Sequence, residues 1–155
     1  MIRKLEALTL NEIQLFGKAL GQKVQPGDII LLFGELGAGK TTITQSIALG
    51  SGISKKECVT SPTFTLINQY ASHYPIYHID LYRLESRLAI ENLGLEEYFF
   101  NNGVTIVEWA EKLLLPENST YMFGIDSRLE IHIEIKTNNT RNINIKSFGL
   151  HSRIP

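Results

Sequence analysis

Long apolar runs and one strictly alternating stretch dominate the pattern of hydrophobic and polar positions along this chain. Residues 28–33 (DIILLF) and 104–108 (VTIVE) are almost continuously apolar, as are strands that a parallel sheet buries on both faces. Between 129 and 136 apolar and polar residues alternate strictly, and residues 141–148 follow after a polar turn. This pattern predicts a half-solvated antiparallel hairpin, so the expected sheet is mixed.

Helical periodicity marks the segments between these strands. Apolar residues recur at helical spacing from 10 to 20, after the capping-box sequence TLNE at 9–12 and before Gly21. Residues 41–49 predict a second helix, 86–100 one or two short helices, and 110–115 a short helical piece that Pro116 ends. Further extended segments are expected at 3–8, 66–70 and 76–80.

Length and composition narrow the class of protein. The chain has 155 residues, no repeat and no linker, which predicts a single domain over residues 1–155. Fifteen Lys and Arg against 16 Asp and Glu give a formal charge of −1, so no general field attracts nucleic acid or an acidic membrane. The single cysteine, Cys58, has no partner for an intramolecular disulfide. Without a signal peptide or an apolar stretch of roughly 18 residues, we expect a cytoplasmic protein with no membrane contact.

The sequence GELGAGKT at residues 34–41 fits the phosphate-binding loop pattern G-x-x-x-x-G-K-[ST]. Its glycines permit positive φ angles and a close approach of backbone N–H groups to an anion. Lys40 adds a positive charge for β- and γ-phosphate oxygens, and Thr41 offers a hydroxyl to Mg²⁺. A chance match in a glycine-containing loop is the alternative, but a buried strand before the loop and a helix after it favour a nucleotide site.

These observations predict an α/β fold of the P-loop NTPase type. Its central sheet is expected to be mixed but mainly parallel and flanked by helices, with the antiparallel hairpin at its C-terminal end. The absence of an N-[KT]-x-D sequence weighs against a GTPase. The absence of an arginine cluster in an insertion weighs against a small-molecule kinase, which uses such a lid.

Asp80 and Glu108 are the candidates for the remaining chemistry, because each ends an apolar strand at the edge where α/β sheets bind their ligands. One acid would hold Mg²⁺ and one would orient the attacking water, although acids at strand ends are also common as solvated caps. Arg83 is either a salt-bridge partner of Asp80 or a phosphate ligand, and we favour the structural role. His78 and Tyr82 are interpreted as packing and hydrogen-bonding groups.

Two further segments leave alternatives open. The hydroxyl-rich sequence SPTFT at residues 61–65 is extended at its start because Pro62 disfavours helix at Ser61. It is either a switch loop that senses the γ-phosphate or metal, or an ordinary loop before a strand. Thr9 precedes the first helix, which is either a simple packing element or one whose N-terminus contacts the nucleotide base.

The combination of GELGAGKTT, SPTFTL, HIDLYRL and VEWAEK closely resembles the TsaE family, also called YjeE, over about residues 5–136. The resemblance implies a small bacterial ATPase required for N6-threonylcarbamoyladenosine at position 37 of tRNAs that read codons starting with A. It implies that the ATPase works with TsaD and TsaB, resets their complex between rounds, and meets tRNA only indirectly through them. Its cofactors would be ATP and Mg²⁺.

The resemblance also implies roles for individual residues. It assigns Mg²⁺ coordination to Thr41 and Glu108, an essential acid to Asp80 and a switch-like role to residues 61–65. Trp109 matches an aromatic position beside the metal acid, and a core aromatic is equally compatible with its size. We therefore expect Lys40, Asp80 and Glu108 to be catalytic. The expected nucleotide contacts are Glu35, Leu36, Gly37, Ala38, Gly39, Lys40, Thr41, Thr42 and Thr9.

The expected activity is a magnesium-dependent P-loop ATPase that is weak alone and activated by its partners. A nucleotide-dependent binding module, whose ATP occupancy alone controls its partners, is the competing hypothesis. Residues 141–155 match no motif of the family.

Overall fold

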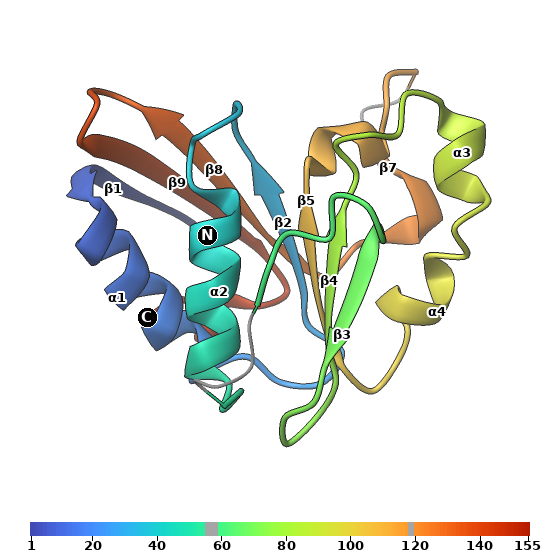
Figure 1. Cartoon of the computed structure of the whole chain (residues 1–155), viewed down its shortest axis with the longest axis horizontal. Helices are drawn as coiled ribbons and strands as arrows, with labels where there is room; N and C mark the ends of the chain where they lie inside the picture. Colours follow the sequence, from blue (N-terminus) through green and yellow to red (C-terminus); the bar gives the residue numbers. More distant parts are fainter. Residues whose placement is uncertain (55–58, 118–119) are drawn as a thin grey trace.

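A computed structural model describes residues 1–54, 59–117 and 120–155 of the chain. Cys58 lies outside these residues. A seven-stranded sheet has the strand order β1-β9-β8-β2-β5-β4-β3 (Figure 1). Its strands are β1 (Ile2–Thr9), β2 (Ile29–Phe33), β3 (Ile67–Tyr70), β4 (Ile76–Asp80), β5 (Val104–Glu108), β8 (Arg128–Ile135) and β9 (Thr140–Phe148).

The central strands β8, β2, β5 and β4 are parallel, whereas β9, β1 and β3 pair antiparallel with their neighbours. This confirms the mixed sheet, mainly parallel at its centre, and the antiparallel hairpin formed by β8 and β9. The predicted strand at 66–70 begins one residue later, because Leu66 has a left-handed backbone with φ of 67°. Because β2, β5 and β4 are parallel, their carboxyl ends meet at one edge of the sheet.

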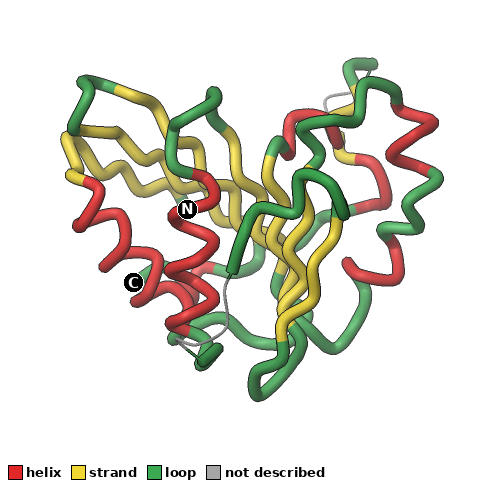
Figure 2. Tube along the Cα trace, in the orientation of Figure 1, coloured by secondary structure: helices red, strands yellow, loops and turns green. Residues whose placement is uncertain are grey.

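Helices cover both faces of the sheet (Figures 1 and 2). On one face lie α1 (Leu10–Gly21) and α2 (Lys40–Gly50). The other face carries α3 (Arg87–Glu91), α4 (Glu96–Phe99), the 3₁₀ turns η1 (Ala110–Leu113) and η2 (Met122–Gly124), and the short pair β6 (Leu114–Leu115) and β7 (Thr120–Tyr121). A last 3₁₀ turn, η3, spans His151–Arg153. None of the helices in the described part of the chain is long and apolar enough to cross a membrane.

Strand β2 shows why the apolar runs are continuous. Ile30 and Leu32 pack into the core beneath α1 and α2, while Ile29, Leu31 and Phe33 pack into the core on the other face. All five residues are buried. A strand at the centre of a sheet covered on both sides has no solvent-facing positions, so its sequence cannot alternate.

One helix prediction at the end of β5 was wrong. Residues 110–115 were expected to be helical up to Pro116, but the 3₁₀ turn ends at Leu113 and Leu114 has an extended backbone. Leu114 pairs with Tyr121 and Leu115 with Thr120. The pairing with a later segment takes these two residues out of the helix, and no local signal announces it.

The N-terminal region fixes the position of α2. The predicted capping box is present: Thr9 N donates to Glu12 Oε2 at 2.8 Å, and Glu12 N donates to Thr9 Oγ1 at 3.3 Å. At its other end α1 meets α2 through Gly21, where a Cβ would collide with the Ile47 carbonyl oxygen. The absence of a side chain there lets the two helices pack backbone to backbone.

The hairpin is less exposed than the alternation predicted. Glu130, on the polar face of β8, is only 5% exposed, and Tyr121 of β7 and Arg128 are in hydrogen-bonding contact with it. Burial alone would raise the pKa of this carboxyl group, but it accepts hydrogen bonds from His132, Tyr121 and Arg128. Together with the Arg128 charge these bonds lower the pKa of Glu130 to about 2. The half-solvated hairpin was predicted with its polar face toward solvent, and at Glu130 this prediction was wrong.

We expect Glu130→Gln to destabilise the fold in a pH-dependent way. The pKa of Glu130 is lowered from 4.5 to about 2 on folding, so its contribution is complete above about pH 4.5 and is lost as the pH falls toward 2. The variant should lose on the order of 2 kcal/mol at pH 7 and show a flatter dependence over this range. Urea unfolding at several pH values measures this. Glu134→Gln, on the exposed part of the same strand, is the matched control, and equal losses in both variants would contradict the assignment.

Candidate nucleotide and metal site

The phosphate-loop sequence forms a tight turn between β2 and α2. Gly34, Gly37 and Gly39 have φ angles of 149°, 78° and 111°, which confirms the expected use of glycine. Gly34 also lies so close to β8 that a Cβ there would come 2.6 Å from the Ile133 carbonyl oxygen. Helix α2 begins at Lys40, so the loop leads directly into a helix N-terminus, where free backbone N–H groups favour an anion.

Lys40 is folded inward across this loop. Its Nζ donates to the carbonyl oxygens of Gly34 at 2.6 Å and Glu35 at 3.0 Å, and it lies 3.8 Å from the ring centroid of Trp109. Only 5% of the residue is exposed. Burial lowers the pKa of the ammonium group, and the charges of Glu108, Glu111, Asp80 and Glu35 act in the opposite direction. Because the groups in direct contact with the Lys40 ammonium are neutral carbonyl oxygens and an aromatic face, they leave its positive charge to interact with a bound anion.

Glu108 connects the carboxyl end of β5 to the phosphate loop. Its Oε2 accepts a hydrogen bond from Thr41 Oγ1 at 3.0 Å, and its Oε1 lies 2.7 Å from His78 Nε2. In the sheet Glu108 is the register partner of Leu32, which is two residues before the loop. The structure therefore brings together Thr41 and Glu108, the two residues expected to hold Mg²⁺.

Asp80 stands beside Glu108, as its register partner on β4. Its Oδ2 accepts from Ser61 Oγ at 2.6 Å, and its Oδ1 accepts from the Tyr82 backbone N–H at 2.9 Å. The Ser61 hydroxyl in turn lies 2.9 Å from that of Thr63. The hydroxyl-rich segment at 61–65 is thus attached to the acid at the end of β4.

The expected ion pair between Arg83 and Asp80 is absent, and that prediction was wrong. Asp80 accepts from the hydroxyl and backbone donors described above, whereas the guanidinium carbon of Arg83 lies 5.1 Å from the ring centroid of Phe64. The chain turns sharply after β4, where Leu84 N bonds to Leu81 O. This turn directs Arg83 outward.

Trp109 has a left-handed backbone, with φ of 60° and ψ of 42°, directly after Glu108. A large aromatic residue rarely adopts this conformation, and such strain is typical of functional sites. The indole ring contacts the Lys40 ammonium group, and the centroid of the Tyr82 ring lies 5.0 Å from that of the indole. Of the two readings of Trp109, the position beside the metal acid agrees with these contacts.

Arg141 is a residue of this region that no sequence pattern singled out. From β9 its guanidinium Nε donates to the Ala38 carbonyl oxygen at 3.3 Å and its Nη2 to that of Gly37 at 3.4 Å. It therefore supports the phosphate loop from β9. Thr9, the candidate base contact, caps α1 and is paired with Thr140, the neighbour of Arg141. A contact between Thr9 and a base stays a prediction.

The donor chemistry fits Mg²⁺. The described residues contain no group of three or more His, Cys, Asp or Glu side chains that could hold a metal ion. Magnesium is usually held by one or two protein oxygens together with substrate phosphates and water, and not by an all-protein cage. The adjacent hydroxyl and carboxylate of Thr41 and Glu108 provide such oxygens beside the phosphate loop.

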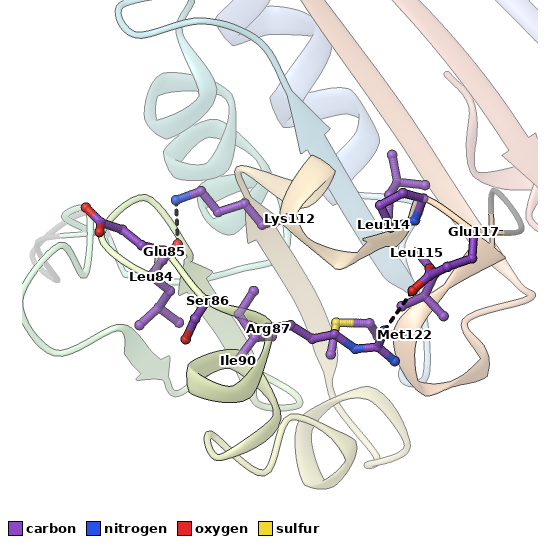
Figure 3. A pocket seen from close by; sticks show the side chains of 11 residues that line it. Leu84, Glu85, Ser86, Arg87, Ile90, Lys112, Leu114, Leu115, Glu117 and Met122 are labelled. Atoms are coloured by element: carbon purple, nitrogen blue, oxygen red, sulfur yellow. Dashed lines mark hydrogen bonds and ion pairs between the residues drawn. The ribbon is translucent and has the colours of Figure 1, made fainter.

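Two depressions of the surface lie near these residues. The one at the phosphate loop, about 230 Å³, is lined by Leu36, Gly37, Gly39, Lys40, Thr41 and Thr42. A larger cavity of about 530 Å³ lies between η1 and α3, and none of the phosphate-loop residues lines it (Figure 3). On its wall Lys112 Nζ donates to the carbonyl oxygens of Tyr82 at 2.6 Å and Leu84 at 2.7 Å. All the expected phosphate-binding residues from Glu35 to Thr42, except Glu35 and Ala38, thus line the smaller depression.

Comparisons with known proteins agree with this picture. The family described as "Threonylcarbamoyl adenosine biosynthesis protein TsaE" matches residues 8–143. The tRNA threonylcarbamoyladenosine biosynthesis protein TsaE of Bacillus subtilis is 39% identical over 153 residues, covering 96% of this chain and 89% of that protein. The protein of the same name from Synechocystis sp. is 45% identical over 109 residues, covering 67% and 68%. A crystal structure of Bacillus subtilis YdiB superposes with a TM-score of 0.76 at 33% identity, covering 98% and 89%.

We expect Lys40→Met to lower the affinity for ATP by at least about tenfold, because a hydrogen bond to a charged group is worth roughly 1.5–3 kcal/mol. Methionine keeps most of the aliphatic packing, so the melting temperature should change little. Fluorescence of the single tryptophan, Trp109, which contacts Lys40, follows the nucleotide titration. Lys136→Met, at an exposed position, is the control. Unchanged ATP affinity in the folded Lys40 variant would refute the phosphate-binding role.

Proposed function

The chain belongs to the TsaE family of threonylcarbamoyl adenosine biosynthesis proteins, and from this premise we propose that it is a magnesium-dependent ATPase. It would serve the formation of N6-threonylcarbamoyladenosine at position 37 of tRNAs that read codons starting with A. The observation that carries the proposal is the 3.0 Å hydrogen bond between Thr41 and Glu108. It joins the phosphate loop to an acid at the carboxyl end of a neighbouring strand, which is the arrangement that P-loop ATPases need.

In this proposal the loop from Glu35 to Thr42 binds the phosphates of ATP through its backbone N–H groups and through Lys40. The N-terminus of α2 adds its dipole. Thr41 and Glu108 would hold Mg²⁺, which neutralises part of the phosphate charge when bound. Each of these groups lies on, or next to, a strand or helix of the core, so the site is supported by rigid elements.

Asp80 has the second acidic role in the proposal. Its bond to Ser61 supports a function in holding the 61–65 segment against the site, where the segment would sense the γ-phosphate. Alternatively, the Asp80 carboxylate itself orients the attacking water. In either case Asp80 and Glu108 have different partners, which supports a division of roles between the two acids.

The proposed partners are TsaD and TsaB, with which the protein would act in the cytoplasm and through which it would meet tRNA. Two arginines lie near the site: Arg83 stacks on Phe64, and Arg141 bonds to carbonyl oxygens of the loop. The residues that line the depression at the phosphate loop include no arginine. The formal charge of −1 supports contact with tRNA through partners. We therefore infer that the isolated protein turns over slowly and that its partners complete the site.

A nucleotide-dependent switch is the second candidate function. The chain of hydrogen bonds from Asp80 through Ser61 to Thr63 favours it, because ATP occupancy alone would reorganise this segment and alter a binding surface. Turnover would then be incidental to the control of TsaD and TsaB.

We expect ATP turnover by the purified protein to rise at least about tenfold when TsaD and TsaB are added, since a supplied arginine alone is worth about 10³ to 10⁵ in related enzymes. Steady-state phosphate release measures this. Addition of the partners to the Lys40→Met variant controls for contaminating activity. A rate that the partners leave unchanged would describe a self-sufficient ATPase.

Glu108→Ala separates the two candidate functions. If hydrolysis drives the cycle, the variant should bind ATP in EDTA as the wild type does, yet abolish both phosphate release and tRNA modification in the reconstituted system. Full modification without hydrolysis would establish the switch instead. Glu97→Ala, at an exposed position on α4, is the control for loss of an acid.

A further inference from the structure

His78 lies in the middle of β4, between Tyr77 and Ile79, and is completely buried. Its Nε2 is 2.7 Å from Glu108 Oε1 on the neighbouring strand. Its other ring nitrogen, Nδ1, is buried and has no hydrogen-bond partner among the described residues. The polar attachment of this ring in the described structure is therefore the carboxylate of Glu108.

This arrangement indicates which nitrogen of the His78 ring donates to Glu108. A carboxylate that serves as a magnesium ligand can only accept, so the shared hydrogen belongs to Nε2 and the ring donates. A hydrogen on Nδ1 would be a buried donor without an acceptor. His78 thus offers its Nε2–H to Glu108, and its Nδ1 makes no hydrogen bond within the described part of the chain.

The two oxygens of Glu108 consequently have different surroundings. His78 donates to Oε1 from within β4, and Thr41 donates to Oε2 from the start of α2. With a donor on each side, the carboxylate has a defined plane, and the oxygen beside Thr41 is the one that faces the proposed metal position.

On the basis of the proposed function, we propose that His78 is a positioning residue that fixes the orientation of Glu108 toward Mg²⁺. His78 acts through Glu108, because its ring is fully buried and Glu108 stands between it and Thr41. Outer partners of metal ligands orient those ligands, and their loss typically costs 10- to 100-fold in metal affinity. Without the N–H, the buried carboxylate would keep a single donor and could rotate away from Thr41.

The alternative is that His78 merely fills space in the sheet, 6.5 Å from the ring of Tyr70. A pair of variants separates the two roles. His78→Phe keeps a ring of similar size but removes the donor, whereas His78→Gln places an amide N–H near the position of Nε2. A space-filling role predicts that the metal affinity of the Phe variant is closer to that of the wild type than the metal affinity of the Gln variant. A positioning role predicts the reverse.

The test is a titration of the purified protein with Mg²⁺ in the presence of a saturating non-hydrolysable ATP analogue. The melting temperature of the protein is measured at each Mg²⁺ concentration. Mn²⁺ titration by electron paramagnetic resonance gives a direct second measure. We expect His78→Phe to raise the apparent Kd for the metal about 10- to 100-fold. His78→Gln should stay within a few fold of the wild type, and analogue binding in EDTA should be the same in all of them. Wild-type metal affinity in a folded His78→Phe variant would overturn the proposal.

Two further variants complete the design. If His78→Phe does not fold, His78→Asn replaces it, because its shorter amide does not reach the position of Nε2. The same difference from His78→Gln is then expected, and equal metal affinities of the two amides would overturn the proposal. Glu108→Gln tests the underlying site. If Glu108→Gln lowers the affinity for the metal while His78→Phe does not, only the role of His78 is wrong. If Glu108→Gln leaves the metal affinity unchanged, the proposed metal site itself is wrong.

Discussion

A buried carboxylate has to be hydrogen-bonded on each oxygen, and in this protein that requirement fixes the position of the site. Removing an ion from water costs several kcal/mol in real proteins, and only well-placed donors offset the cost. Glu108 is 2% exposed and receives one donor from α2 and one from β4. Its carboxylate therefore links α2 to β4 and β5 beside the phosphate loop.

The packing of α2 gives this junction its precision. The helix lies backbone to backbone against α1 at Gly21, and the loop before it touches β8 at Gly34. Neither contact tolerates a Cβ, so the helix and its loop have little freedom to shift relative to the sheet. Thr41, in the first turn of the helix, is thereby held at hydrogen-bonding distance from Glu108. A site built on such elements is preorganised for a charged ligand.

Glu130, another buried acid, shows how a structural charge cluster differs from the candidate phosphate site. Glu130 receives hydrogen bonds from Tyr121, Arg128 and His132, so its charge is matched entirely by the protein. Lys40 is also buried, but its direct partners are carbonyl oxygens and an aromatic ring. The charge of Glu130 is already balanced within its cluster. The charge of Lys40 is not balanced by its direct contacts, so a phosphate group can balance it.

The sequence by itself determined the features that depend on neighbours along the chain. These include the strands at 29–33 and 104–108, the capping box at Thr9, the glycine turn and the first helical turn after it, because periodicity and local sterics decide them. Tertiary structure alone decided the bond between His78 and Glu108, the support of the loop by Arg141 and the burial of Glu130. Bonds such as that from Arg141 to Gly37, 104 residues apart, depend on strand order and register, which no local pattern specifies. For the same reason the pairing of Leu114 with Tyr121 contradicted the local expectation.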